Sequence, residues 1–290
     1  MNPALLSRLF DRPADANKYD FGHVLIVGGS PGMVGAPLLA AMGALRVGAG
    51  LATVASQADV VDKLEKRVAE VMTLRLPAGA DAAVHALQTF VHEHHVRALA
   101  IGPGLDRSHV PLVTAVVQQL AVPAVVDGGA LAAFSADAAA VQPAALGGIV
   151  LTPHAGEFAR LAGQQPPKDR AQLKRVVAQY AKAHNVVLVF KGRHTLVASP
   201  AHALYENATG NPGLATAGTG DVLAGVIAGL LAQRFAPVDA ATLGVYLHGL
   251  AADMAVRTTT QAGLVASDVL SALPAALQAA LVGNPATMKA

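Results

Sequence analysis

The stretch that decides the fold runs from Glu206 to Gln233 and reads ENATGNPGLATAGTGDVLAGVIAGLLAQ. Its second half, from Asp221, is apolar and rich in Ala and Gly, which predicts a helix packed tightly against a neighbour. Its first half is built from residues that favour turns over helices and strands, namely Asn207, Gly210, Asn211, Pro212 and Gly213. The boundary between the two halves therefore lies at a helix N-terminus.

This boundary, Ala217-Gly218-Thr219-Gly220-Asp221, has the properties of an anion site. The first amides of a helix lack intrahelical acceptors, the helix dipole is positive there, and glycine lets a ligand approach the backbone. Asp221 has two interpretations. It caps the helix, or it is a base beside a developing charge that the amides stabilise. The stretch alone supports both equally.

The composition indicates a compact globular chain. Hydrophobic residues make up 53% of the 290 residues and charged residues only 14%, which argues against disorder. A net charge of +2 without a basic cluster, and 4% aromatic residues without Trp, argue against nucleic-acid binding. The absence of cysteine excludes disulfides and thiolate chemistry. We see neither a signal peptide nor an apolar run long enough to span a membrane, so we expect a cytoplasmic protein.

Short apolar segments alternate with helical segments along the chain. Strands are expected at His23–Val27, Leu51–Ala55, Val71–Leu76, Arg97–Ile101, Ala124–Val126, Gly148–Leu151 and Val186–Phe190, with an antiparallel ribbon at Thr195–Ala198 and Ala203–Tyr205. Helices are expected at Gly35–Val47, Ala58–Glu70, Ala80–His95, Val110–Leu120, Lys168–His184 and through most of Asp221–Val282. This pattern predicts an α/β fold whose mostly parallel sheet is covered by helices on both faces. We expect one domain over residues 1–290, with an N-terminal leader of about 20 residues.

Glycine and polar residues follow one expected strand after another. In a parallel sheet these strand ends share the edge at which ligands bind. Gly28-Gly29-Ser30-Pro31-Gly32 and Gly102-Pro103-Gly104 are weak signals that tight turns also explain. In Thr152-Pro153-His154-Ala155-Gly156-Glu157 we expect His154 and Glu157 to be exposed. Lys191 closes a strand that has no other charge, and it is either a phosphate partner or a surface lysine.

Four motifs follow one another along the chain: Gly28-Gly29-Ser30…Gly35-Ala36-Pro37, Gly102-Pro103-Gly104-Leu105, Thr152–Glu157 and Asn207-Ala208-Thr209-Gly210-Asn211-Pro212-Gly213…Gly218-Thr219-Gly220-Asp221. Together they resemble the ADP-dependent NAD(P)H-hydrate dehydratases, a ribokinase-like family, from about Lys18 to about Leu273. The resemblance implies nucleotide-dependent dehydration of S-NADHX and S-NADPHX to NADH and NADPH. The co-substrate would be ADP, giving AMP and phosphate, or ATP, and Mg²⁺ would assist.

The resemblance also implies roles for the matching residues. Asp221 would be the catalytic base at the reacting hydroxyl, and the amides of Gly218, Thr219 and Gly220 would form the anion hole. The hydrated dinucleotide would contact Ala36, Gly104, His154 and Asp221. The adenine nucleotide would contact Lys191, Gly192, Arg193, His194, Thr195 and Gly220. No metal ligands are assigned.

The resemblance further implies cooperation with an NAD(P)HX epimerase. Many bacterial relatives carry one as an N-terminal domain, and we expect it here on another polypeptide because too few residues precede Phe21. A homo-oligomer is expected, with a tetramer as the suspected form.

Two other functions use the same residues. A small-molecule kinase of the same fold would use Asp221 and the anion hole to phosphorylate a hydroxymethyl group. His154 and its neighbours fit the dehydratase pattern better. A catalytically silent nucleotide-binding protein would not need both Asp221 and Lys191. Product analysis distinguishes the three.

Overall fold

The computed structural model describes residues 3–67, 69–135 and 148–282. Its strands are β1 (His23–Val27), β2 (Leu51–Ser56), β3 (Met72–Arg75), β4 (Val96–Ile101), β5 (Ala124–Val126), β6 (Ile149–Leu151), β7 (Val187–Phe190), β8 (Leu196–Ala198) and β9 (Tyr205–Glu206). Its α-helices are α1 (Pro3–Phe10), α2 (Gly35–Arg46), α3 (Ala58–Leu64), α4 (Ala80–Glu93), α5 (Val110–Gln119), α6 (Ala155–Ala162), α7 (Arg170–Ala183), α8 (Thr219–Ala232), α9 (Pro237–Ala255) and α10 (Ala266–Val282). Among the 3₁₀ segments, η2 spans Gly128–Phe134.

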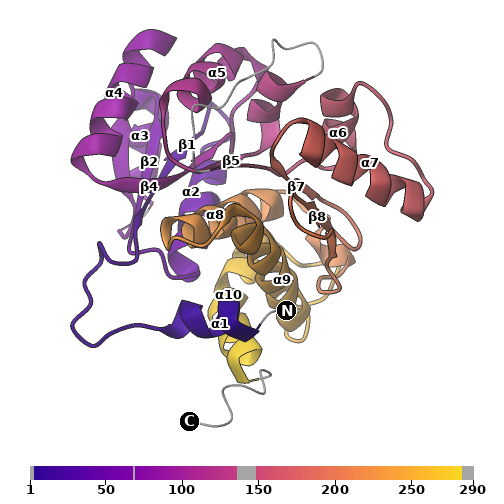
Figure 1. Ribbon diagram of the computed structural model, residues 1–290. Helices are drawn as coiled ribbons and strands as arrows, with labels where there is room; N and C mark the ends of the chain where they lie inside the picture. The colour runs from indigo at the N-terminus through magenta and orange to yellow at the C-terminus, as the bar shows by residue number, and fades with distance from the viewer. Residues whose placement is uncertain (1–2, 68, 136–147, 283–290) are drawn as a thin grey trace.

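The strands form one sheet in the order β3-β2-β1-β4-β5-β6-β7-β8-β9. The pairs from β3 to β7 are parallel, and β8 and β9 pair antiparallel, as the sequence predicts. Because successive side chains of a strand point to opposite faces, β1 contributes Val24 and Ile26 to one core and Leu25 and Val27 to the other. The first core lies under α2, α8, α9 and α10, and the second under α4, α5, α6 and α7 (Figure 1). The predicted coverage of both faces is confirmed.

Helix α8 packs against α2 through small residues, as predicted. An ideal Cβ at Gly225 would lie 1.8 Å from the Ala40 carbonyl oxygen, and one at Gly229 would lie 2.7 Å from that of Ala44. No larger side chain fits between these backbones. The close approach keeps the N-termini of α2 and α8 near each other.

Two local expectations differ from the structure. Helix α3 ends at Leu64 instead of Glu70, and the three charged residues that follow it, Glu65, Lys66 and Arg67, are exposed. Within the leader, residues 3–10 form α1, a helix that was not expected from the sequence. Leu6 and Leu9 are buried in the core beneath α9 and α10, so part of the leader belongs to the packed fold. No helix in the described residues has the length and hydropathy to cross a membrane.

Candidate functional site

The segment before α8 is held by its own side chains. Asn207 is buried and donates from its amide to the carbonyls of Thr209 (2.9 Å) and Val245 (3.4 Å). Asp253 of α9 accepts hydrogen bonds from the Gly210 amide at 2.8 Å and the Asn211 side chain at 3.0 Å. These hydrogen bonds hold the turn-forming segment that precedes α8 in one conformation.

Helix α8 begins after Gly218, whose φ of 88° favours glycine. Asp221 is the third residue of the helix, and no side chain caps the N-terminus. In the described part of the chain the Asp221 carboxyl group forms no hydrogen bond or ion pair. Burial raises its pKa to about 7, the nearby charge of Asp127 adds to this rise, and Lys191 opposes it. This arrangement disfavours the capping interpretation and places a proton acceptor at neutral pH beside the helix amides.

Lys191 follows β7 and joins Asp221 at this site. Its Nζ lies 2.7 Å from Asp127 Oδ1 and 3.8 Å from Glu157 Oε2. Burial disfavours the charged ammonium, but Asp127 and Glu157 outweigh it and raise the pKa of Lys191. An ideal Cβ at Gly220 would lie 3.4 Å from Nζ, so the ammonium lies against the first turn of α8. The structure therefore brings Lys191, Gly220 and Asp221 together.

Asp127 was not among the expected site residues. It is buried at the end of β5, and Thr152 donates a hydrogen bond of 2.6 Å to the same Oδ1 that pairs with Lys191. Asp127 carries the same signal as the other candidates, a polar residue directly after a buried strand. That signal was available in the sequence.

His248 was also missed, and nothing in the apolar sequence of α9 distinguishes it. Its Nε2 donates a hydrogen bond to the Thr219 carbonyl at 2.9 Å, and this bond holds the first residue of α8 in place. Burial lowers the pKa of His248 to about 4, and the Lys191 charge contributes. The imidazole is therefore neutral at pH 7.

Within the expected anion hole, the Thr219 hydroxyl faces inward. It donates to the carbonyls of Leu214 at 2.8 Å and Thr216 at 3.1 Å. Only the backbone amides of this turn remain to face an anion.

His154 lies at the end of β6 and is the N-cap of α6. Its Nδ1 accepts hydrogen bonds from the amides of Gly156 (3.0 Å) and Glu157 (3.3 Å). Its side chain is 57% exposed, as expected. The expected exposure of Glu157 is wrong. Its side chain is 10% exposed because Oε2 accepts from the His154 amide at 2.8 Å and faces Lys191.

Ala36 and Gly104 come together at the start of α2. Gly104 follows β4 with a φ of 73°, and Ser30 donates to its carbonyl at 2.7 Å. An ideal Cβ at Gly104 would lie 3.1 Å from the Cβ of Ala36, which is in the first turn of α2. These two expected substrate contacts are therefore neighbours.

The segment Lys191–Thr195 forms the turn between β7 and β8. Thr195 Oγ1 donates to the Gly192 carbonyl at 3.0 Å, and Arg170 donates to the His194 carbonyl. Arg193 and His194 are exposed in this turn. The expected nucleotide contacts thus extend outward from Lys191.

Two pockets open along the same edge, and Asp221 lines neither. One, of about 310 Å³, lies at the ends of β1, β2 and β4, and the other, of about 400 Å³, lies between η2 and α6. The described residues contain no group of three or more His, Asp or Glu arranged to hold a metal ion. A metal ion here would depend largely on ligands from a bound phosphate group.

Known proteins are similar to this chain in sequence and in fold. The family model described as NAD(P)H-hydrate dehydratase matches residues 24–275. The bifunctional NAD(P)H-hydrate repair enzyme of Moorella thermoacetica is 45% identical over 94% of this chain, which spans only 52% of that relative. The ADP-dependent (S)-NAD(P)H-hydrate dehydratase of Neisseria meningitidis is 34% identical over 90% of this chain and 86% of its own length.

Solved structures agree with this match. The ADP/ATP-dependent NAD(P)H-hydrate dehydratase of Bacillus subtilis, co-crystallised with ATP and Mg²⁺, has a TM-score of 0.81 and 32% identity, covering 96% of this chain and 97% of its own. A ribokinase-like protein of Enterococcus faecalis shares the fold, which confirms the predicted fold class. By the family match across most of its length, this chain belongs to the NAD(P)H-hydrate dehydratase family.

Proposed function

We propose that this protein dehydrates S-NADHX and S-NADPHX to NADH and NADPH in the cytoplasm, converting ADP to AMP and phosphate. The observation that carries the proposal is Asp221, a partly buried carboxyl group with a pKa of about 7 at the first turn of α8, beside Lys191. Relatives described as ADP-dependent (S)-NAD(P)H-hydrate dehydratases support both the substrate and the nucleotide.

Hydroxide is a poor leaving group from a saturated ring, so the hydroxyl must first be converted to a better one. Asp221 takes the hydroxyl proton, and the oxygen attacks the terminal phosphoryl group of ADP. The bond from phosphorus to the AMP oxygen breaks, and AMP leaves with its electron pair. The amides of Gly218, Thr219 and Gly220 stabilise the charge on the phosphoryl oxygens, and Lys191 supplies a positive charge.

Elimination completes the reaction. The lone pair of the ring nitrogen expels phosphate as the carbon–oxygen bond breaks, and loss of a proton from the neighbouring carbon forms the double bond. Mg²⁺, when bound, neutralises part of the phosphate charge. Asp127 and Glu157, the two carboxylates that face Lys191, would be the protein's ligands for this cation, and the nucleotide phosphates would supply most of the others.

Several parts of the proposal concern partners. His154 and the pair Ala36 and Gly104 would contact the hydrated dinucleotide, and Lys191–Thr195 with Gly220 would contact the nucleotide. The curated relatives named bifunctional repair enzymes are about twice as long as this chain, which supports cooperation with an epimerase activity. We also propose that the protein forms a homo-oligomer, a tetramer, which light scattering would test.

The test is recovery of NADH absorbance at 340 nm (the standard NADH band) from hydrated NADH with Mg²⁺ and either ADP or ATP. We expect stoichiometric AMP and phosphate with ADP. A stable phosphorylated product without NADH would show a kinase instead, and no turnover with either nucleotide would refute the proposal.

A further inference from the structure

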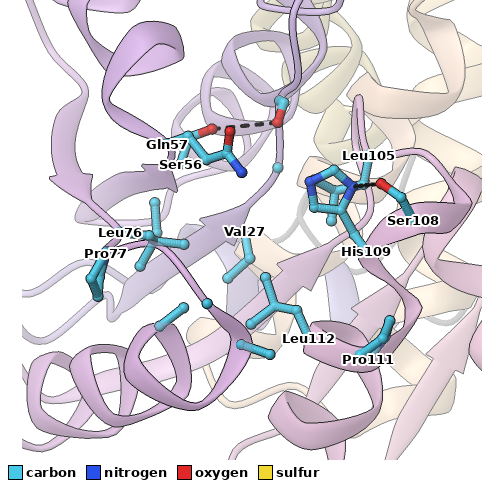
Figure 2. A pocket seen from close by; sticks show the side chains of 16 residues that line it. Val27, Ser56, Gln57, Leu76, Pro77, Leu105, Ser108, His109, Pro111 and Leu112 are labelled. Atoms are coloured by element: carbon cyan, nitrogen blue, oxygen red, sulfur yellow. Dashed lines mark hydrogen bonds between the residues drawn. The ribbon is translucent and has the colours of Figure 1, made fainter.

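The pocket at the ends of β1, β2 and β4 is built for an uncharged ring. Its volume of about 310 Å³ lies at the lower end of the range for small-molecule sites. Leu76, Leu105 and Leu112 surround the opening, with Gln57 on one side and His109 on another (Figure 2). Among the 16 described residues that line it, none is Asp, Glu, Lys or Arg. Such walls favour a flat heterocycle over a phosphate group.

The pocket adjoins the proposed substrate contacts through Gly29. Gly29 lines the pocket, and an ideal Cβ at Gly104 would lie 3.2 Å from its Cα. The same Cβ would lie 3.1 Å from Ala36, so the first turn of α2 begins where the pocket ends. This turn leads on to α8, because an ideal Cβ at Gly218 would lie 2.6 Å from Leu39 of α2.

The spacing along the sheet matches a ligand with a ring at each end. Asp127, which faces Lys191, follows β5, and three strand steps separate β5 from β2 in the sheet order. At about 4.8 Å per step the β2 side of the pocket, where Gln57 lies, is roughly 14 Å along the sheet from β5, and the β4 side is one step away. An extended dinucleotide separates its two rings by a comparable distance. Its diphosphate would cross the first turn of α2, which no side chain caps.

We propose that this pocket receives the adenine ring of the hydrated dinucleotide. The assignment rests on the proposed function, which requires the hydrated nicotinamide ring to lie at Asp221. The adenine end is then the part of the substrate left to reach the uncharged pocket. The nucleotide co-substrate, near Lys191–Thr195, does not enter it.

A thiol placed in the pocket tests this directly, because the chain has no cysteine of its own. Gln57 is exposed, lines the pocket and makes no capping hydrogen bond at the start of α3. Gln57→Cys would be modified with a maleimide reagent in the presence of hydrated NADH, hydrated reduced nicotinamide mononucleotide, or ADP, each alone. Gln172→Cys, on an exposed position of α7, is the matched control.

We expect hydrated NADH to slow modification of Gln57→Cys at least tenfold. The mononucleotide and ADP should change it less than twofold, and Gln172→Cys should be unaffected by all three. Protection by ADP alone would assign the pocket to the co-substrate and overturn the inference. The inference would also be overturned if hydrated NADH gave no protection to a Gln57→Cys protein that still dehydrates it with ADP. Protection is measured without turnover, so loss of dehydratase activity in the wild-type assay would count against the proposed function separately.

Discussion

Replacing Asp221 with Asn separates a base from a residue that merely starts a helix. The side chain is the third residue of α8 and forms no hydrogen bond in the described part of the chain. Asn has nearly the same shape but cannot take up a proton. We therefore expect turnover at pH 8 to fall at least about a hundredfold, the low end for removal of a general base.

Although its turnover falls, the Asp221→Asn variant should have a higher free energy of unfolding than wild type at pH 8. The rise in the Asp221 pKa from its usual 3.8 to about 7 corresponds to about 4 kcal/mol. Because the fold favours the protonated form, this stabilisation is complete below about pH 4 and is lost as the pH rises through 7. A neutral amide has no charged form to bury. Asp221→Asn should thus be more stable than wild type at pH 8, by about 2–4 kcal/mol, and the difference should shrink toward pH 5.

Urea unfolding at pH 5 and pH 8, with NADH formation measured on the same samples, checks both expectations. The wild-type kcat/KM should rise with pH through about 7, as Asp221 loses its proton. Asp239→Asn is the matched control, because Asp239 is the third residue of α9. It should cost about 0.3–1 kcal/mol through the helix dipole and leave turnover unchanged. If Asp221→Asn unfolds more easily at pH 8 while its turnover stays normal, the base assignment is refuted.

Three further changes test the surroundings of Asp221. Lys191→Met should lower the free energy of unfolding in urea by about 3–5 kcal/mol, because it leaves Asp127 buried without its cation. The same variant should bind ADP more weakly in calorimetry. Adding Asp127→Leu should restore the stability but not the ADP binding. His248 resists protonation in the fold, so this residue should remove about 3 kcal/mol of wild-type stability as the pH drops from 6.5 to 4, which offsets the gain from protonating Asp221. His248→Gln should therefore become more stable relative to wild type over this range in a pH series of unfolding curves. His154→Ala should lose about 1 kcal/mol through its missing cap and bind hydrated NADH more weakly, with ADP binding unchanged by calorimetry. His154→Asn keeps a capping oxygen, so it should lose only affinity for hydrated NADH and no stability. If the affinities for hydrated NADH and ADP fall equally, His154 only supports the fold.

The sequence by itself determined the order of the elements and the edge that carries the site. Strand β1 was predicted to the residue because His23 and four apolar residues are followed by a glycine turn, and both signals are local. The start of α8 was predicted from the turn residues after Glu206 and the apolar run after Asp221. Parallel strands place their carboxyl ends on one edge, so Lys191 and His154 could be assigned to it before any contact was known.

The tertiary structure decided which of these groups meet and how each is charged. Lys191 contacts Asp127, 64 residues earlier in the chain, and the pairing depends on the position of β5 within the sheet. Glu157 is buried because it reaches both the His154 amide and Lys191. His248 is neutral because it is buried where α9 packs against the start of α8. Sequence patterns report how a residue prefers to fold with its near neighbours. A pKa depends on burial and on charges brought together from distant segments, and these exist only once the chain has packed.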